Sequence, residues 1–157
     1  MEKSNESGDI SVSESTNERR KGEWKSDNID KLASALALAQ AHMKGAAKKS
    51  VNPFFKSNYA DLHSVIESSL PHLNAQELSV IQGNDVDENG SFYITTMLLH
   101  SSGQWIKSKL KMPITKADAQ GVGATITYAR RFALSAMVGI AQVDDDGNSI
   151  QLTDKKQ

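Results

Sequence analysis

The sequence predicts an α+β fold in which an antiparallel β-hairpin packs against one long helix, with further helices on the N-terminal side. Three features of the 157-residue chain predict it. Residues 116–139 contain no proline and space their apolar residues at a helical period. Residues 91–112 are typical of two strands joined by a glycine turn. Residues 28–47 and 58–71 repeat apolar positions every three or four residues, which indicates two earlier helices.

Composition divides the chain into one domain and two tails. Residues 1–26 are rich in Glu, Ser, Asn and Lys and have too little apolar surface to order themselves, which predicts a disordered tail. Residues 27–148 form the predicted domain, and residues 149–157 form a short flexible tail. The chain has no internal repeat.

The absence of cysteine and the distribution of charge limit the function classes. With no cysteine, disulfides and thiolate metal sites are excluded. No apolar run approaches the ~20 residues of a membrane span, so we expect a cytoplasmic protein that does not use a membrane. The net charge is -1, yet residues 28–140 hold eleven bases and eight acids while both ends are acidic. This asymmetry favours a core that binds a polyanion.

The two N-terminal helices have recognisable start and stop signals. Asp27 or Asn28 is the expected N-cap of the first, and the basic residues 44, 48 and 49 suit its C-terminal end. Asn58 or Asp61 is the expected cap of the second, which we expect to stop or kink at Pro71.

The hairpin has a defined expected register. A strand begins near Leu78, and residues 84–90 form a polar turn before the next strand. The turn at residues 101–103 pairs Phe92 with Met112 and Leu98 with Ile106, which places these residues on a core face. The opposite face of the last strand carries Trp105, Lys107, Lys109 and Lys111.

The long helix, which we expect Thr115 to cap, carries two adjacent arginines on an otherwise apolar element. Its predicted apolar stripe consists of Val122, Ile126, Ala129, Ala133, Ala136 and Met137. Arg131 points away from that stripe and Arg130 lies on its flank. Each guanidinium needs an anionic partner, which is either an internal carboxylate, such as Asp118 or Asp61, or a ligand.

The sequence contains little that indicates catalysis or metal binding. The sequence has no phosphate-binding loop, nucleophile elbow or zinc-protease motif. Gly121 and Gly123 fall inside the helical pattern, where small residues permit close helix approach. Residues 144–148 resemble half of a calcium loop without its bidentate glutamate, which favours a solvated turn over a metal site.

The row of Trp105, Lys107, Lys109 and Lys111 is the most specific binding signal in the residues themselves. Alternate strand residues repeat at about 6.6–7 Å on one face, close to the distance between phosphates in an extended single strand. Three lysines then form an electrostatic track, and the tryptophan offers a stacking platform. The alternative is a solvated lysine edge that discourages aggregation. Phe54, Phe55, Lys56 and Tyr59 lie within six residues of one another and form a second aromatic and basic segment earlier in the chain.

Three segments resemble the essential-recombination-function (ERF) family of phage single-strand annealing proteins. They are residues 52–62, beginning Asn-Pro-Phe-Phe-Lys, residues 99–106, and residues 118–148, with Tyr-Ala-Arg-Arg-Phe at 128–132 and Asp-Asp-Asp-Gly-Asn at 144–148. Family members often continue beyond this last motif into a longer C-terminal region, whereas the present sequence has nine further residues.

The resemblance implies an ATP-independent recombinase with a β-β-β-α core that forms a homo-oligomeric ring or helical filament. It implies that single-stranded DNA lies in a basic groove, between the hairpin and the following helix, with its bases exposed. Candidate protein partners are a phage exonuclease and a host single-strand-binding protein. The alternatives are a single-strand protector that does not anneal and a structural or regulatory oligomer. We expect no catalysis, cofactor or metal, and a DNA-binding set of Phe55, Lys56, Tyr59, Trp105, Lys107, Lys109, Lys111, Lys116, Tyr128, Arg130 and Arg131.

Overall fold

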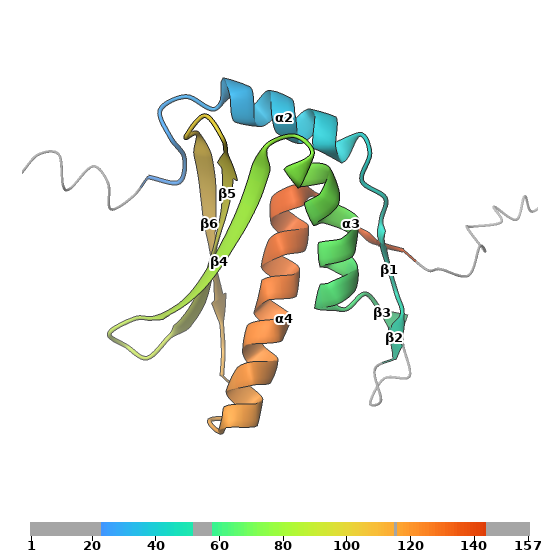
Figure 1. Cartoon of the computed structure of the whole chain (residues 1–157). Coiled ribbons are helices and arrows are strands. Elements are labelled where there is room, and N and C mark those ends of the chain that lie inside the picture. The colour runs from blue at the N-terminus through green and yellow to red at the C-terminus, as the bar shows by residue number, and fades with distance from the viewer. Residues whose placement is uncertain (1–22, 52–57, 115, 144–157) are drawn as a thin grey trace, which may run out of the picture.

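A computed structural model describes residues 23–51, 58–114 and 116–143 of the chain (Figure 1). The elements are α2 (Asp30–Gln40), β1 (Ala46–Ala47), β2 (Ser50–Val51), β3 (Asn58–Tyr59), α3 (Leu62–Asn74), β4 (Leu78–Val86), β5 (Phe92–His100), β6 (Trp105–Met112), α4 (Ala119–Val138) and β7 (Gln142–Val143). A three-stranded antiparallel sheet packs on α4, α3 packs on another side of α4, and α2 crosses one end. The predicted α+β class is confirmed.

The sheet has the strand order β4-β5-β6 and the predicted hairpin register. Phe92 pairs with Met112, and Leu98 pairs with Ile106. Gly103 in the connecting turn has φ +87, a conformation that a side chain would disfavour. β4 continues to Val86, so the strand includes residues at the start of the predicted turn.

The sheet and α4 enclose one part of the core. Phe92 and Ile94 of β5 are buried against Ala129 and Ala133 of α4. The small alanines let the helix approach the sheet closely, and burying each large side chain contributes about 1.5–3 kcal/mol. A second buried cluster joins α2, α3, the start of β4 and the last turns of α4.

The first helix is shorter than predicted. It covers residues 30–40, its N-cap is Ile29, and no side chain caps it. The predicted basic end at residues 44, 48 and 49 lies beyond the helix, because the chain leaves the helical path to form β1. The Ala46 N–H donates to the carbonyl of Ala141, and β1 pairs in parallel with β7.

The second helix starts at the predicted cap and passes through the predicted stop. The Asp61 carboxylate accepts from the N–H of Ser64 at 2.8 Å. The helix continues through Pro71 to Asn74, so of the two expected outcomes the stop is wrong, and a kink at Pro71 stays a prediction. Its extra turn is stabilised by Leu73, which is fully buried in the core.

The long helix is capped by Asp118, whose carboxylate accepts from the N–H of Gly121 at 2.7 Å. Thr115, the cap expected from the sequence, lies outside the described residues. Gly139, with φ +72, ends the helix. The predicted apolar stripe is partly wrong, because Ala136 is exposed while Leu134 and Val138 on the arginine side are buried. The reason is that α4 contacts both the sheet and α3. No helix among the described residues is both long and apolar enough to cross a membrane.

Candidate nucleic-acid interface

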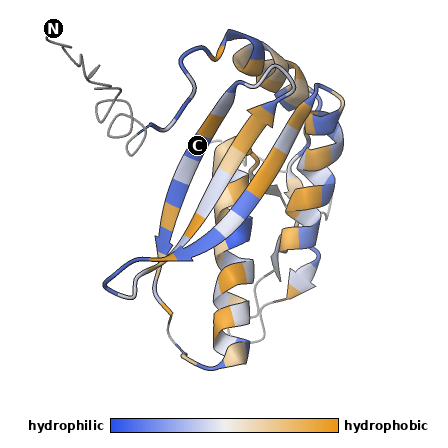
Figure 2. Cartoon of the chain, turned by 60° about the vertical axis from the view of Figure 1, so that its left-hand side comes forward, coloured by the Kyte–Doolittle hydropathy of each residue, from blue (hydrophilic) through white to orange (hydrophobic). Residues whose placement is uncertain are grey.

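The sheet has one face packed on α4 and one face that no helix of the described residues covers, which we call the open face (Figure 2). Along β5, buried residues alternate with partly exposed ones. Ile106, Leu110 and Met112 of β6 pack with the core clusters. Because side chains alternate along a strand, the intervening residues of β6 lie on the open face. The predicted placement of Trp105, Lys107, Lys109 and Lys111 opposite the core face is confirmed.

The lysines of the open face, Lys107, Lys109 and Lys111, lie over aromatic rings, and we call these three the lysine row. The Lys107 Nζ lies 5.2 Å from the ring centroid of Trp105. The Nζ atoms of Lys109 and Lys111 lie 4.2 and 5.8 Å from the ring of Tyr93. Cation–π attraction of this kind contributes about 0.5–1 kcal/mol at exposed sites and restricts where the ammonium groups lie. The rings therefore hold three cations along one strand.

Tyr93 was not among the DNA-binding residues predicted from the sequence. The predicted hairpin register pairs it with Lys111, which indicates that its side chain lies on the open face. It pairs with Lys111 across the ladder. Its hydroxyl donates to the Asp87 carboxylate at 3.0 Å, which fixes the ring. Hydrogen bonds from Ser91 N–H, with smaller contributions from Tyr93 and Asn89, hold the pKa of Asp87 below its usual value. Lys109 also forms an ion pair with Asp85 of β4 at 3.5 Å.

A short segment before α2 extends the open face beyond β6. Lys25 forms an antiparallel bridge with Ile106, and the Lys107 N–H donates to the carbonyl of Trp24 at 2.7 Å. This pairing places Trp24 beside Lys107 on the open face, where it is 60% exposed. No periodic pattern marks Trp24 in the sequence, and residues 23–26, assigned by composition to the tail, contact the sheet here.

Arg131 is buried, with 7% of its surface exposed. Its Nη1 donates to the carbonyl of Ala60 at 2.9 Å, and its Nε has no hydrogen-bond partner among the described residues. The guanidinium lies 4.7–5.0 Å from the ring centroids of Tyr59, Tyr128 and Phe132. We call these four residues the arginine cluster. The cluster joins α4 to the end of β3.

Arg130 lies on the side of α4 that faces the sheet. Its Nε donates to the Gln82 Oε1 at 3.3 Å, and the Gln82 amide donates back to the Arg130 carbonyl at 2.9 Å. Arg130 is partly exposed. Across the described ranges, neither arginine forms an ion pair with Asp118 or Asp61, the internal partners suggested by the sequence.

Those two carboxylates have other partners. Lys116 Nζ lies 2.8 Å from Asp118 Oδ2, and this contact, with the Gly121 N–H, holds the pKa of Asp118 below its usual value. The pKa of Asp61 is lowered by hydrogen bonds from Ser64 N–H and from the Ser50 hydroxyl at 2.7 Å.

The predicted site residues therefore divide into separate groups. Trp105 and the lysine row share the open face, whereas Arg130, Arg131, Tyr128 and Tyr59 lie on the helix side of the sheet. Within one chain, α4 and the lysine row do not face each other, so they are not the two walls of one groove. Lys116 lies in the connection before α4. Phe55 and Lys56 lie outside the described residues, as does the segment 144–148.

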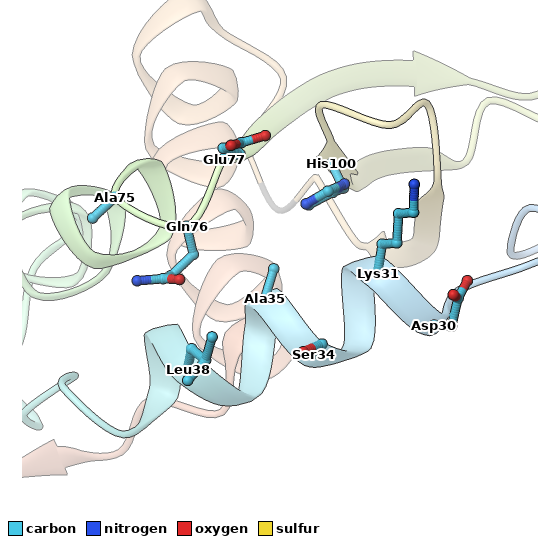
Figure 3. Close-up of a pocket in the computed structure, with 9 residues that line it drawn as sticks. All are labelled: Asp30, Lys31, Ser34, Ala35, Leu38, Ala75, Gln76, Glu77 and His100. Carbon is cyan, nitrogen blue, oxygen red and sulfur yellow. The ribbon is translucent and has the colours of Figure 1, made fainter.

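A pocket of about 460 Å³ lies at the other end of the sheet from Lys111, beside α2 and the β5–β6 turn (Figure 3). Its lining mixes Asp30 and Glu77 with Lys31 and His100. A hydrogen bond from the Gln104 side chain is the main cause of a lowered Asp30 pKa. The described part of the chain contains no group of three or more His, Cys, Asp or Glu side chains placed to hold a metal.

Comparison with known proteins identifies the family of the chain. Neither the curated proteins nor the solved structures contain a significant match. The model of the ERF superfamily matches residues 32–157, which include most of α2 and all of α3, the three-stranded sheet and α4. This span covers most of the chain, so the protein belongs to the ERF superfamily.

Proposed function

We propose that this protein binds single-stranded DNA on the open face of its sheet and anneals complementary strands without ATP, as a homo-oligomeric ring or filament. Membership of the ERF superfamily supports a role in phage recombination and strand annealing in general. Proteins of this family are known as annealing proteins without enzymatic activity. The observation that carries the proposed binding surface is the lysine row, held over Trp105 and Tyr93 on a sheet face that no helix covers.

The arrangement of cations over rings suits contact with phosphates rather than with bases. Each lysine that pairs with a phosphate releases counterions, and this release supplies most of the affinity in nonspecific binding. Because ammonium groups occupy positions over the Trp105 and Tyr93 rings, these rings position cations in the free protein. Phosphates held on the lysine side leave base edges accessible to a second strand. Duplex formation then drives pairing, so no hydrolysis is needed.

The two arginines have different proposed roles. Arg131 is buried, and we propose that it organises the region where α4 meets β3. Arg130 is partly exposed, and it is the arginine of the pair that we propose to contact phosphate. Within one chain, Arg130 and the lysine row lie on different sides of the sheet. A continuous DNA path that contacts both Arg130 and a lysine row therefore requires a neighbouring copy of the protein.

An annealing assay tests the function. Two complementary fluorescent oligonucleotides are mixed with the purified protein at low salt without ATP. We expect pairing at least tenfold faster than without protein. Binding of DNA with slower pairing would instead assign the protein to single-strand protectors. Absence of both binding and acceleration would favour a structural or regulatory oligomer.

A further inference from the structure

The two edges of the sheet differ in how much of their backbone is paired. β4 forms one edge and β6 the other. The segment around Lys25 pairs with the first half of β6. Among the described residues, no strand pairs with the outer edge of β4 or with the second half of β6.

Hydrogen bonds at both ends of the β4–β5 ladder show which backbone N–H and C=O groups of β4 point away from β5. The Ser101 N–H donates to the Glu77 carbonyl, and the Asp87 N–H donates to the Ser91 carbonyl. These pairs continue the β4–β5 register, and inward and outward groups alternate along an antiparallel strand. The even-numbered residues, Leu78, Val80, Gln82, Asn84 and Val86, therefore direct their N–H and C=O groups outward. Of these groups, the Val86 N–H donates to the Asp85 carboxylate of the same strand at 2.8 Å.

The same reasoning shows which backbone N–H and C=O groups of β6 point away from β5. The His100 N–H donates to the Gln104 carbonyl, so the odd-numbered residues of β6 direct their backbone groups outward. Trp105 exchanges hydrogen bonds with Ser26, and the Lys107 N–H donates to Trp24. The outward groups of Lys109 and Lys111 have no strand beside them in the described part of the chain.

The free parts of the two edges carry opposite charge at the same end of the sheet. Asp85, Asp87 and Glu88 lie at the end of β4, with no base between them, whereas β6 carries the lysine row and no acid. Val86, Phe92 and Met112 are in register across the three strands. The acidic end of β4 and the basic end of β6 therefore lie at the same end of the sheet, on its two opposite edges.

β4 lacks the usual features that prevent an edge strand from pairing. It contains neither lysine nor proline, and its apolar residues Ile81 and Val86 are 57% and 56% exposed. Natural edge strands are commonly protected by charge, proline or a covering segment. This nine-residue edge has Asp85 as its one charged residue and no covering segment among the described residues, so it is suited to pair with a strand that carries positive charge.

We infer that β4 of one copy pairs with residues 108–112 of β6 in a second copy. The occupant is a second copy because the complementary free edge and the complementary charge lie on the same chain. β4 and β6 run in the same direction, so copies in the same orientation pair these edges in parallel. The contact uses two different surfaces, so it is heterologous and propagates into a ring or filament.

This assembly would place the open faces of successive copies side by side, so that each lysine row adjoins the next. The inference specifies the interface of the oligomer in the proposed function. It makes no use of DNA and is tested without DNA, so failure of the interface and failure of annealing are separate results.

Proline substitutions test the two edges separately. Asn84→Pro removes an outward N–H from β4, and Lys109→Pro removes one from β6; neither removes a β5 hydrogen bond. Asn84→Ala and Lys109→Ala are the matched controls that keep the N–H. We expect sedimentation velocity to show wild-type assemblies larger than two copies. We expect each proline variant alone to be monomeric, with a dissociation constant at least tenfold higher than that of its alanine control. We expect an equimolar mixture of the two proline variants to form a complex of two chains.

A second pair of variants leaves the backbone intact. The single changes Glu88→Lys and Lys111→Glu keep the ion pair between Asp85 and Lys109 within each chain. Each change should weaken assembly alone, and mixing the two proteins should restore it. Circular dichroism verifies the fold of every variant. The inference is overturned if the wild type is monomeric or stops at two copies. It is also overturned if folded proline variants assemble like the wild type, or if neither mixture forms a complex.

Discussion

Arg130 and Arg131 are neighbours in sequence and occupy different environments, because successive residues on a helix diverge by about 100°. Arg131 is enclosed by Tyr59, Tyr128 and Phe132 and donates to a carbonyl. Arg130 shares hydrogen bonds with Gln82 and remains partly exposed. A helical projection separates the two side chains but does not predict which is buried, since that depends on where α3 and β3 pack.

The burial of Arg131 predicts a large effect on stability. Arg131→Ala removes a hydrogen bond and contacts with three rings, so we expect the free energy of unfolding to fall by about 2–4 kcal/mol. Arg130→Ala is the matched control and should cost less than about 1 kcal/mol. Chemical denaturation of both variants measures the difference. Equal losses would show that Arg131 does not organise the cluster.

Tyr93 tests whether an aromatic ring positions the lysine row. Tyr93→Leu removes the ring below Lys109 and Lys111 while leaving every charge in place. We expect affinity for single-stranded DNA to fall about two- to fivefold, which corresponds to about 0.5–1 kcal/mol. Tyr93→Phe keeps the ring and should bind within about twofold of the wild type. Fluorescence anisotropy makes the measurement; identical affinity of the Leu variant and the wild type would remove Tyr93 from the site.

At the scale of elements, the hairpin was predictable in register because turn length and alternation determine which residues pair. Helix ends were less predictable. Pro71 lies inside α3 because burial of Leu73 beyond it stabilises another turn. The two faces of the sheet could be assigned from the sequence, but the separation of the lysine row from α4 could not, because the direction in which a helix returns over a sheet is a tertiary property.

Gly121 and Gly123 lie two residues apart on α4 and have different surroundings. A Cβ on Gly121 would clash with the backbone carbonyl oxygen of Lys116, whereas a Cβ on Gly123 would meet none of the described residues within 4 Å. The expected role in helix–helix approach is therefore wrong, since the close contact of Gly121 is with the preceding connection.

This difference predicts opposite effects of the same substitution. Gly121→Ala should lower the melting temperature, because the clash is with backbone and displaces the Asp118 cap. Gly123→Ala should raise stability by about 0.5–1 kcal/mol, because alanine favours a helix interior. Thermal denaturation compares the two. A neutral or stabilising Gly121→Ala would contradict the close packing of the first turn.

At the scale of the whole molecule, three carboxylates in different parts of the fold accept hydrogen bonds that stabilise local structure. Asp61 links α3 to β2, Asp118 caps α4, and Asp87 closes the β4–β5 turn. The pKa of each is lower in the folded state than its ordinary value. The folded protein therefore holds these protons more weakly than the unfolded chain.

Stability should consequently depend on pH in the acid range. With folded pKa values depressed, their stabilisation is present above the ordinary aspartate pKa of about 4 and is lost as the pH falls below it. Asp61→Asn should be less stable than the wild type at pH 7 and lose less stability between pH 5 and pH 3. Urea denaturation of the wild type and the variant between pH 3 and pH 7 measures the free energy of unfolding of each. An equal acid loss in the variant would exclude Asp61 as a contributor.

The central claim is that the lysine row on the open face binds the phosphates of single-stranded DNA, and the salt dependence of binding tests it most directly. A triple variant with Lys107, Lys109 and Lys111 changed to alanine is compared with one in which Lys31, Lys44 and Lys49, outside the sheet, are changed. The two variants have equal net charge. We predict that the first lowers the slope of log K against log salt by about 2, since each phosphate contact contributes about 0.7 for a single strand, and that the second leaves the slope unchanged. Equal slopes in the two variants would contradict the claim.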